Sequence, residues 1–351
     1  MKEFTSFSGR KRPLASNDAR KAEFHEIPTI SLAVEEQVII EQLRDACTRV
    51  GFFYIKDHGV SQEIIDCVFD TAKRFFDQPG QTKNEINYKK SKVLHGYEPI
   101  SEVRTDETKR ADLNEAFNCG YEPDLDPVDN GPDRKAQSAN PMEGPNAWPA
   151  MSGFKQNVTA YYGEVLMLAR RIVRLFAKVL DLDEDYFDSA MATPGAMLRL
   201  LKYPAQDPRE PDALGIGAHT DIEAFTILCQ GTQPALQILN VDGQWIQAPP
   251  VPGTFVVNIG DMLARWSNDV FISTVHRVHN CTGAERYSIP FFMGPSYDTM
   301  LRPLPTCLQR DGKAKYEPIL AGEYVWKRLS QSRLSDAERQ SVGQTVTTAV
   351  A

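Results

Sequence analysis

The feature that most constrains the fold is a change in residue pattern after Pro194. Beyond it, short runs of apolar and β-branched residues alternate with Gly, Pro, Asn and Asp, so this half of the chain is predicted to consist of strands and turns. The predicted strands span residues 196–203, 224–230, 236–239, 245–248, 254–260, 273–280 and 286–293. Short strands in close succession predict a double-sheet roll.

The first half of the chain is predicted to be mainly helical. Apolar residues recur at helical spacing over residues 35–50, and over residues 154–182 they stay on one face for nearly the whole run. Residues 51–60 predict a strand, after which Ser61 is a good N-cap for another helix. Residues 83–149 are rich in Asn, Asp, Gly and Pro, which indicates long loops or short edge elements. Helices that precede strands in this way predict an α+β fold, with the helices packed on one face of the roll.

Composition bears on the partners and the location of the protein. The chain has 351 residues, 42% of them hydrophobic, and its formal net charge of -8 argues against nucleic acid as the main partner. No run approaches the ~20 apolar residues that span a bilayer, and the N-terminal residues lack the apolar stretch of a secretory signal. The six cysteines form no CxxC pair, which favours a reducing compartment. A cytoplasmic protein that binds neither membranes nor nucleic acid is expected.

A histidine and an aspartate stand at the head of the apolar run 224–230. His219 and Asp221 are two positions apart, so in an extended segment both side chains point to the same side. Such a pair alone is more typical of capping or solvated residues, but with a second histidine it would form the donor set of a divalent iron site. His276 and His279 are the candidates, and because they face opposite sides of a strand the residues alone leave the choice open.

A second polar pair follows within the last predicted strand. Arg286 and Ser288 share one face of that strand. A guanidinium binds a carboxylate bidentately and a hydroxyl adds a further hydrogen bond, so this pair predicts a site for the distal end of a dicarboxylate. A β-sandwich without a site would leave the placement of both pairs and the later histidine unexplained.

These motifs together resemble the iron- and 2-oxoglutarate-dependent dioxygenases, specifically the isopenicillin N synthase-like group. The C-terminal motifs are HTD at 219–221, NIGDMLARWSND at 258–269, STVHRVHN at 273–280 and RYSIPFF at 286–292. The N-terminal motifs are IPTISL at 27–32, GFFYIKDHGV at 51–60, HGYEP at 95–99, DLNEAF at 112–117 and NAWP at 146–149. The resemblance therefore extends from about residue 27 to about residue 330.

The resemblance implies a double-stranded β-helix, or jelly roll, as the core of one integrated catalytic unit. The expected parts are a flexible N-terminal arm (1–25), a helical and loop region (26–150), the long helix with the jelly-roll catalytic core (151–335) and a loosely held tail (336–351).

The resemblance also implies which histidine completes the metal site. The third ligand of the family falls on His276, so Fe(II) is expected at His219, Asp221 and His276. His279 is then expected to be structural.

The expected cosubstrate site follows from the same resemblance. Arg286 and Ser288 fall on the residues that bind the C5 carboxylate of 2-oxoglutarate, and Tyr203 falls on a hydroxyl that helps to anchor it. Two positions depart from the family pattern. Leu201 stands where plant members often have Asn, and Glu223 stands where many members have Gly.

The implied activity is oxidation of a C–H bond of a small-molecule metabolite by dioxygen, with conversion of 2-oxoglutarate into succinate and CO2. Hydroxylation, desaturation and ring formation are all possible outcomes, a role in secondary metabolism is expected, and no oligomeric state is predicted. The alternatives are an iron oxidase of the same fold that does not use 2-oxoglutarate and an ethylene-forming reaction on 2-oxoglutarate itself. A non-catalytic member is disfavoured because all the ligands are present.

The substrate is expected to be a small hydrophobic metabolite, on family grounds alone. Three aromatic residues are candidates for the cavity wall but are more typical of an ordinary core: Phe225, Trp266 and Phe291. Three charged residues are candidates for contact with a polar substrate but are more typical of solvated surface: Glu102, Arg104 and Arg110.

Overall fold

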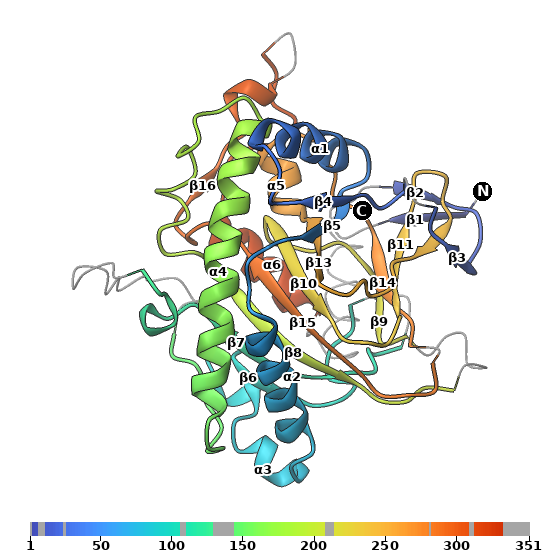
Figure 1. Ribbon diagram of the computed structural model, residues 1–351, viewed down its shortest axis with the longest axis vertical. Coiled ribbons are helices and arrows are strands. Elements are labelled where there is room, and N and C mark those ends of the chain that lie inside the picture. The colour runs from blue at the N-terminus through green and yellow to red at the C-terminus, as the bar shows by residue number, and fades with distance from the viewer. Residues whose placement is uncertain are drawn as a thin grey trace, which may run out of the picture.

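A large sheet forms the centre of the protein (Figure 1). In spatial order its eight strands are β4 (Thr29–Ser31), β5 (Phe52–Lys56), β13 (Thr254–Ile259), β10 (Phe225–Gln230), β15 (Arg286–Met293), β8 (Met197–Tyr203), β7 (Glu115–Gly120) and β6 (Gly96–Glu98). The computed structural model describes residues 2–5, 11–23, 26–105, 110–128, 144–207, 214–280, 282–308 and 312–332. Both halves of the chain therefore contribute strands to one sheet.

A smaller sheet packs against the large one. Its five strands are β3 (Ala19–Lys21), β12 (Trp245–Gln247), β11 (Leu236–Leu239), β14 (His276–Val278) and β9 (Ile216–His219). Phe52, Tyr54 and Val256 of the large sheet share a buried cluster with Leu236 and Ile238 of the small one. The strands thus form the predicted jelly roll. Two further pairs are β1 (Lys2–Thr5) with β2 (Lys11–Leu14) and β16 (Met300–Leu301) with β17 (Ile319–Leu320).

The long helices cover the other face of the large sheet (Figure 1), whereas the last helix, residues 321–332, also reaches the cavity on the side of the small sheet. The helices are α1 (Glu36–Arg49), α2 (Gln62–Phe76), α3 (Gly80–Asn84), α4 (Phe154–Val179), α5 (Asp261–Trp266) and α6 (Ala321–Ser332), and short 3-10 turns lie at Tyr88–Lys90, Pro123–Leu125 and Pro305–Cys307. Helices α1, α2 and α4 share one buried cluster with the sheet. The α+β class with helices on one face is confirmed. Within the described residues, no helix is long and apolar enough to cross a membrane.

Successive side chains of the central strands point alternately into the core beneath the helices and into a cavity between the two sheets. The side chains that face the helices are apolar: Leu198 and Leu200 of β8, Phe225 and Ile227 of β10, and Ile289 and Phe291 of β15. The intervening residues line the cavity and include polar groups: Arg199 and Tyr203 of β8, Thr226 of β10, and Arg286 and Ser288 of β15. The two-residue period of a strand therefore brings the candidate residues to one side of the sheet.

Several elements were not predicted from the sequence. Strands β1, β2 and β3 lie in the segment predicted to be a flexible arm, and β6 and β7 lie in the region predicted to hold loops or edge elements. The predicted strand 273–280 shortens to β14. Just before β14, Thr274 Oγ1 donates to Val50 O at the end of α1 at 2.6 Å, and the preceding Ile272 N–H donates to Cys47 O of α1 at 2.9 Å. The predicted tail, 336–351, lies outside the described residues.

Candidate active site

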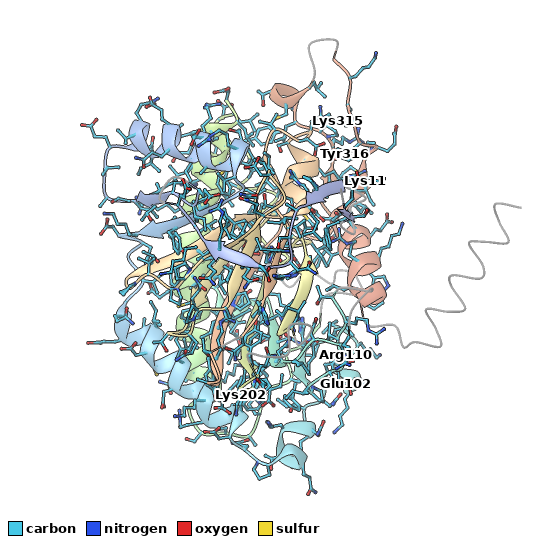
Figure 2. All side chains as sticks on the ribbon, turned by 90° about the vertical axis from the view of Figure 1, so that its right-hand side faces the viewer. Lys11, Glu102, Arg110, Lys202, Lys315 and Tyr316 are labelled. Atoms are coloured by element: carbon cyan, nitrogen blue, oxygen red, sulfur yellow. The ribbon has the colours of Figure 1, made fainter. Side chains whose placement is uncertain are left out.

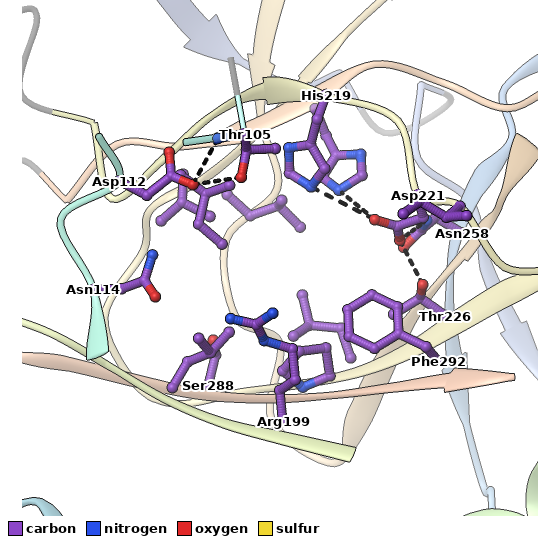
Figure 3. A pocket seen from close by; sticks show the side chains of 18 of the residues that line it. Thr105, Asp112, Asn114, Arg199, His219, Asp221, Thr226, Asn258, Ser288 and Phe292 are labelled. Atoms are coloured by element: carbon purple, nitrogen blue, oxygen red, sulfur yellow. Dashed lines mark hydrogen bonds and ion pairs between the residues drawn. The ribbon is translucent and has the colours of Figure 1, made fainter. Parts of the chain in front are cut away.

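Three candidate ligands converge where β9 and β14 pair. His219 ends β9 and stands opposite His276, the first residue of β14. The Nε2 atoms of both rings lie 3.5 Å from Asp221 Oδ1, and the ring centroids are 4.2 Å apart. All three ligand atoms lie within 4.8 Å of one another. The register of β9 and β14 thus places His276, and not His279, beside the first pair. Figure 3 shows the ring of His219 directed toward Asp221.

Backbone carbonyls fix the orientation of both imidazoles. His219 Nδ1 lies 2.8 Å from Gly217 O, and His276 Nδ1 lies 3.2 Å from Thr274 O. A carbonyl oxygen only accepts, so each Nδ1 carries the proton and each Nε2 offers its lone pair to the space beside Asp221. Gly217 is held in turn by Asp112, whose Oδ1 accepts its N–H at 2.9 Å.

The carboxylate of Asp221 is oriented by two donors. Asn258 Nδ2 donates to Oδ2 at 2.7 Å, and Thr226 Oγ1 donates to the same oxygen. Oδ1 is thereby directed toward the imidazoles. Burial by itself would raise the pKa of Asp221, but His276 and His219 hold it well below its usual range. The donor set is thus two imidazole nitrogens and one ionised carboxylate oxygen, which fits Fe(II) with positions left open toward the cavity.

Loss of the amide of Asn258 should weaken metal binding. Groups that orient a ligand typically contribute about 10- to 100-fold to metal affinity, and Asn258→Leu is expected to lower Fe(II) affinity by about that factor. Anaerobic Fe(II) titration measures the change. Asn118→Leu is the matched control, because Asn118 is equally buried in the same sheet and its amide has no hydrogen bond among the described residues. Equal Fe(II) affinity in the Asn258 variant and wild type would contradict the assigned role of the amide.

The junction of β13 and α5 holds the turn that carries two of the candidate ligands. A Cβ on Gly260 would lie 2.1 Å from Glu223 O, so only glycine allows this approach. Asp261 Oδ2 accepts Thr220 Oγ1–H at 2.9 Å and Arg328 Nη1–H at 2.9 Å. Helix α6 is therefore tied through Arg328 and Asp261 to Thr220, which lies between the candidate ligands His219 and Asp221.

A buried arginine lies elsewhere on the cavity wall. Arg286, Ser288 and Tyr203 are each 1% exposed. Arg286 Nη1 donates to Ser288 Oγ at 3.2 Å, Ser288 Oγ lies 3.5 Å from Tyr203 OH, and the guanidinium lies 4.7 Å from the centroid of the tyrosine ring. Leu201, which is opposite Ser288 in the sheet, adds an apolar side chain to the same wall.

The hydrogen-bonding capacity of Arg286 is not satisfied by the described residues. Its Nε has no partner there, and no carboxylate there forms an ion pair with it. Burial lowers the pKa of Arg286, which reflects the cost of a charge removed from water. A buried guanidinium without an anion is unfavourable, so this end of the cavity fits the carboxylate of a bound dicarboxylate such as 2-oxoglutarate.

The remainder of the cavity has two charged residues that sequence reasoning missed, Arg199 and Arg328, and one, Glu223, that it named only as a departure from the family pattern. Arg199 Nη2 donates to Glu98 Oε2 at 2.7 Å, and Figure 3 shows Arg199 extending into the cavity. Arg328, from α6, lines the same cavity and is paired with Asp261. Glu223 is 5% exposed and also lines it, and burial, followed by the charge of Asp221, raises its pKa to about 7.

The other sequence candidates lie away from the cavity. The aromatic residues Phe225, Trp266 and Phe291 are buried in the core between sheet and helices. Of the three charged loop residues, Glu102 pairs with Lys89 at 2.5 Å and Arg110 is exposed (Figure 2). Arg104 is half-buried. The cavity lining includes none of these six residues. Val103 and Thr105 of the same loop line it instead.

Comparison with protein families matches both halves of the chain. Residues 27–151 match the family described as non-haem dioxygenase in morphine synthesis, N-terminal, and residues 194–295 match the 2OG-Fe(II) oxygenase superfamily. The second range contains His219, Asp221, His276 and the Arg286–Ser288 pair.

Individual relatives agree with these matches. A 2-oxoglutarate-Fe(II) type oxidoreductase of Metarhizium majus is 38% identical over 86% of this chain and 84% of its own. A homoarginine-6-hydroxylase of Oryza sativa subsp. japonica is 35% identical over 83% of this chain and 88% of its own. The crystal structure of a full-length Neurospora crassa protein in complex with alpha-KG and thymine has a TM-score of 0.74 and 29% identity, covering 87% of this chain and 96% of that one. The chain therefore belongs to the 2-oxoglutarate- and Fe(II)-dependent oxygenases, and it is a dioxygenase that uses Fe(II) and 2-oxoglutarate.

Proposed function

We propose that His219, Asp221 and His276 hold the catalytic Fe(II). The observation that carries the proposal is the convergence of two Nε2 atoms on Asp221 Oδ1, each at 3.5 Å. The carbonyls behind the imidazoles and the donors behind the carboxylate support it, because they leave these three atoms oriented and available.

Arg286, Ser288 and Tyr203 bind the C5 carboxylate of 2-oxoglutarate in this proposal. The guanidinium provides N–H donors and the charge, and the two hydroxyls add hydrogen bonds from one side. The apolar side chains of Leu201, Leu236 and Phe292 exclude water from the cavity that contains both ends of the cosubstrate.

The reaction converts a C–H bond of the substrate, 2-oxoglutarate and dioxygen into oxidised product, succinate and CO2. When bound, Fe(II) and 2-oxoglutarate supply the activation of dioxygen. The chain contributes orientation: the Arg286 cluster fixes one end of the cosubstrate, and the cavity wall that includes Arg199 and Glu223 positions the substrate carbon. Residues 26–150 and 151–335 act as one unit, because strands from both ranges form the sheet that carries the site.

The substrate is a small molecule, and nucleic acid is excluded as a substrate in this proposal. Two of the three named proteins act on or bind small nitrogen compounds, homoarginine in one case and thymine in the other. The site lies between two sheets, and the net charge of -8 disfavours binding of a polyanion. The protein acts in the cytoplasm, which agrees with the free thiols of Cys47, Cys119 and Cys229.

The proposal is tested by anaerobic titration of the Fe(II)-loaded protein with 2-oxoglutarate. A visible metal-to-ligand charge-transfer band should appear and saturate, because the 2-oxo acid end binds the metal directly. Succinate is the control ligand: it has the distal carboxylate but no 2-oxo group, so it should compete with 2-oxoglutarate without producing a band. Absence of the band in protein that has bound iron would instead support an oxidase that works without 2-oxoglutarate.

A further inference from the structure

Glu223 places a carboxylate beside the iron ligands on the cavity wall. It follows Asp221 by two positions, at the turn between β9 and β10, and is 5% exposed. The Cβ and Cγ atoms of Glu223 pack beside Gly294: a Cβ added to this glycine would lie 3.7 Å from Glu223 Cγ. The fold therefore accommodates this side chain in an interior position, where a carboxylate needs hydrogen-bond donors.

Among the described residues, no other residue donates a hydrogen bond to the carboxylate of Glu223. Its own backbone N–H is the one local donor that favours the charged form. Arg199 and Arg328 act on it only through longer-range attraction, and each is already paired with another carboxylate, Arg199 with Glu98 and Arg328 with Asp261. A buried carboxylate with one local donor is unfavourable unless a ligand supplies the others.

The cosubstrates do not supply those donors. 2-Oxoglutarate has two carboxylates and no N–H group, so it repels Glu223. The two positive charges of Fe(II) balance the two negative charges of 2-oxoglutarate, and Asp221 balances Arg286. Glu223 therefore adds a negative charge that the loaded site does not compensate. Asp112, the other carboxylate on this wall, cannot offset the charge of Glu223, because it is itself an acid. Its oxygens already accept hydrogen bonds from Gly217 and Thr105.

We propose that Glu223 binds a cationic nitrogen group, an amine or a guanidinium, of the primary substrate. The enzyme then oxidises a basic small molecule, and not the hydrophobic metabolite that the family alone suggested. This inference rests on the proposed iron and 2-oxoglutarate sites, because they define which part of the cavity is left for the substrate.

The test uses the Fe(II)- and 2-oxoglutarate-loaded protein without oxygen and three probes of similar size and different charge. Butylguanidine is cationic, butylurea is neutral and pentanoate is anionic. A probe that binds beside the iron perturbs the charge-transfer band, so binding is read without turnover. In wild type, butylguanidine should perturb the band at the lowest concentration. In Glu223→Gln its affinity should fall about 10- to 100-fold, the usual contribution of a hydrogen bond to a charged group.

Two controls separate this inference from the proposed function. The 2-oxoglutarate titration of Glu223→Gln should saturate at the wild-type concentration or below it, because the variant removes a negative charge that repels the cosubstrate, and a saturating band shows that the variant is folded. Glu102→Gln, a carboxylate outside the cavity, should bind butylguanidine as wild type does. If the wild-type band responds best to pentanoate, or does not respond to butylguanidine, the inference about Glu223 is overturned while the proposed iron and 2-oxoglutarate sites stand. Unchanged affinity in Glu223→Gln has the same consequence. Absence of any band before a probe is added overturns the proposed site, and this inference with it.

Discussion

His276→Ala is expected to abolish tight iron binding and turnover together. The substitution removes one of three donor atoms, and because changes in groups that merely orient a ligand cost about 10- to 100-fold, loss of the ligand itself should cost more than about 100-fold in Fe(II) affinity. Anaerobic Fe(II) titration and succinate release measure the two effects. His276 also packs edge-on against Phe52, with 5.1 Å between the ring centroids, so the substitution removes a core contact as well. Thermal unfolding therefore checks that the variant keeps its fold.

His279→Ala is the matched control for this prediction. His279 is three positions further along, half-buried, and its backbone N–H donates to Ala235 O at 2.9 Å. Its imidazole is not part of the His219–Asp221–His276 group, so iron affinity and turnover should stay close to wild type. If the effects were exchanged between the two variants, the assignment of the third ligand would be wrong.

The fold was predictable where the sequence signal is long or strictly periodic. The long helix was expected over 154–182 and is α4, Phe154–Val179, because 26 residues with one apolar face leave little ambiguity. Short elements were missed. Strand β9 has 4 residues and α5 has 6, and both depend on partners distant in the chain. Local pattern carries no information about such partners.

The site was predictable only in part, for a related reason. Spacing of two residues predicts that His219 and Asp221 point to the same side of an extended segment, and the 3.5 Å between His219 Nε2 and Asp221 Oδ1 fits this prediction although β9 ends at His219. The choice between His276 and His279 depends on the register of β14 against β9, which spacing does not reveal. Glu223, Arg199 and Arg328 come from three separate segments, so only the folded chain brings them to one cavity.

Arg286→Met is expected to raise the 2-oxoglutarate concentration needed for saturation. Loss of one partner of a buried charge pair costs about 2 kcal/mol or more, which corresponds to about 30-fold or more in affinity. The charge-transfer titration measures this change. Arg199→Met serves as the control, because Arg199 lines the same cavity but is paired with Glu98, so its loss should leave 2-oxoglutarate affinity nearly unchanged.

The stability of the Arg286 variant distinguishes a cosubstrate anchor from a structural residue. Without 2-oxoglutarate, Arg286→Met should unfold at the same temperature as wild type or higher, because the substitution removes a buried charge that has no anionic partner among the described residues. With saturating Fe(II) and 2-oxoglutarate only wild type should gain strongly in stability, since a ligand stabilises the state that binds it. A variant that is destabilised without ligand, yet binds 2-oxoglutarate as wild type does, would show that Arg286 supports the fold. The Arg286–Ser288 pair would then be available to the substrate, as in the oxidases that do not use 2-oxoglutarate.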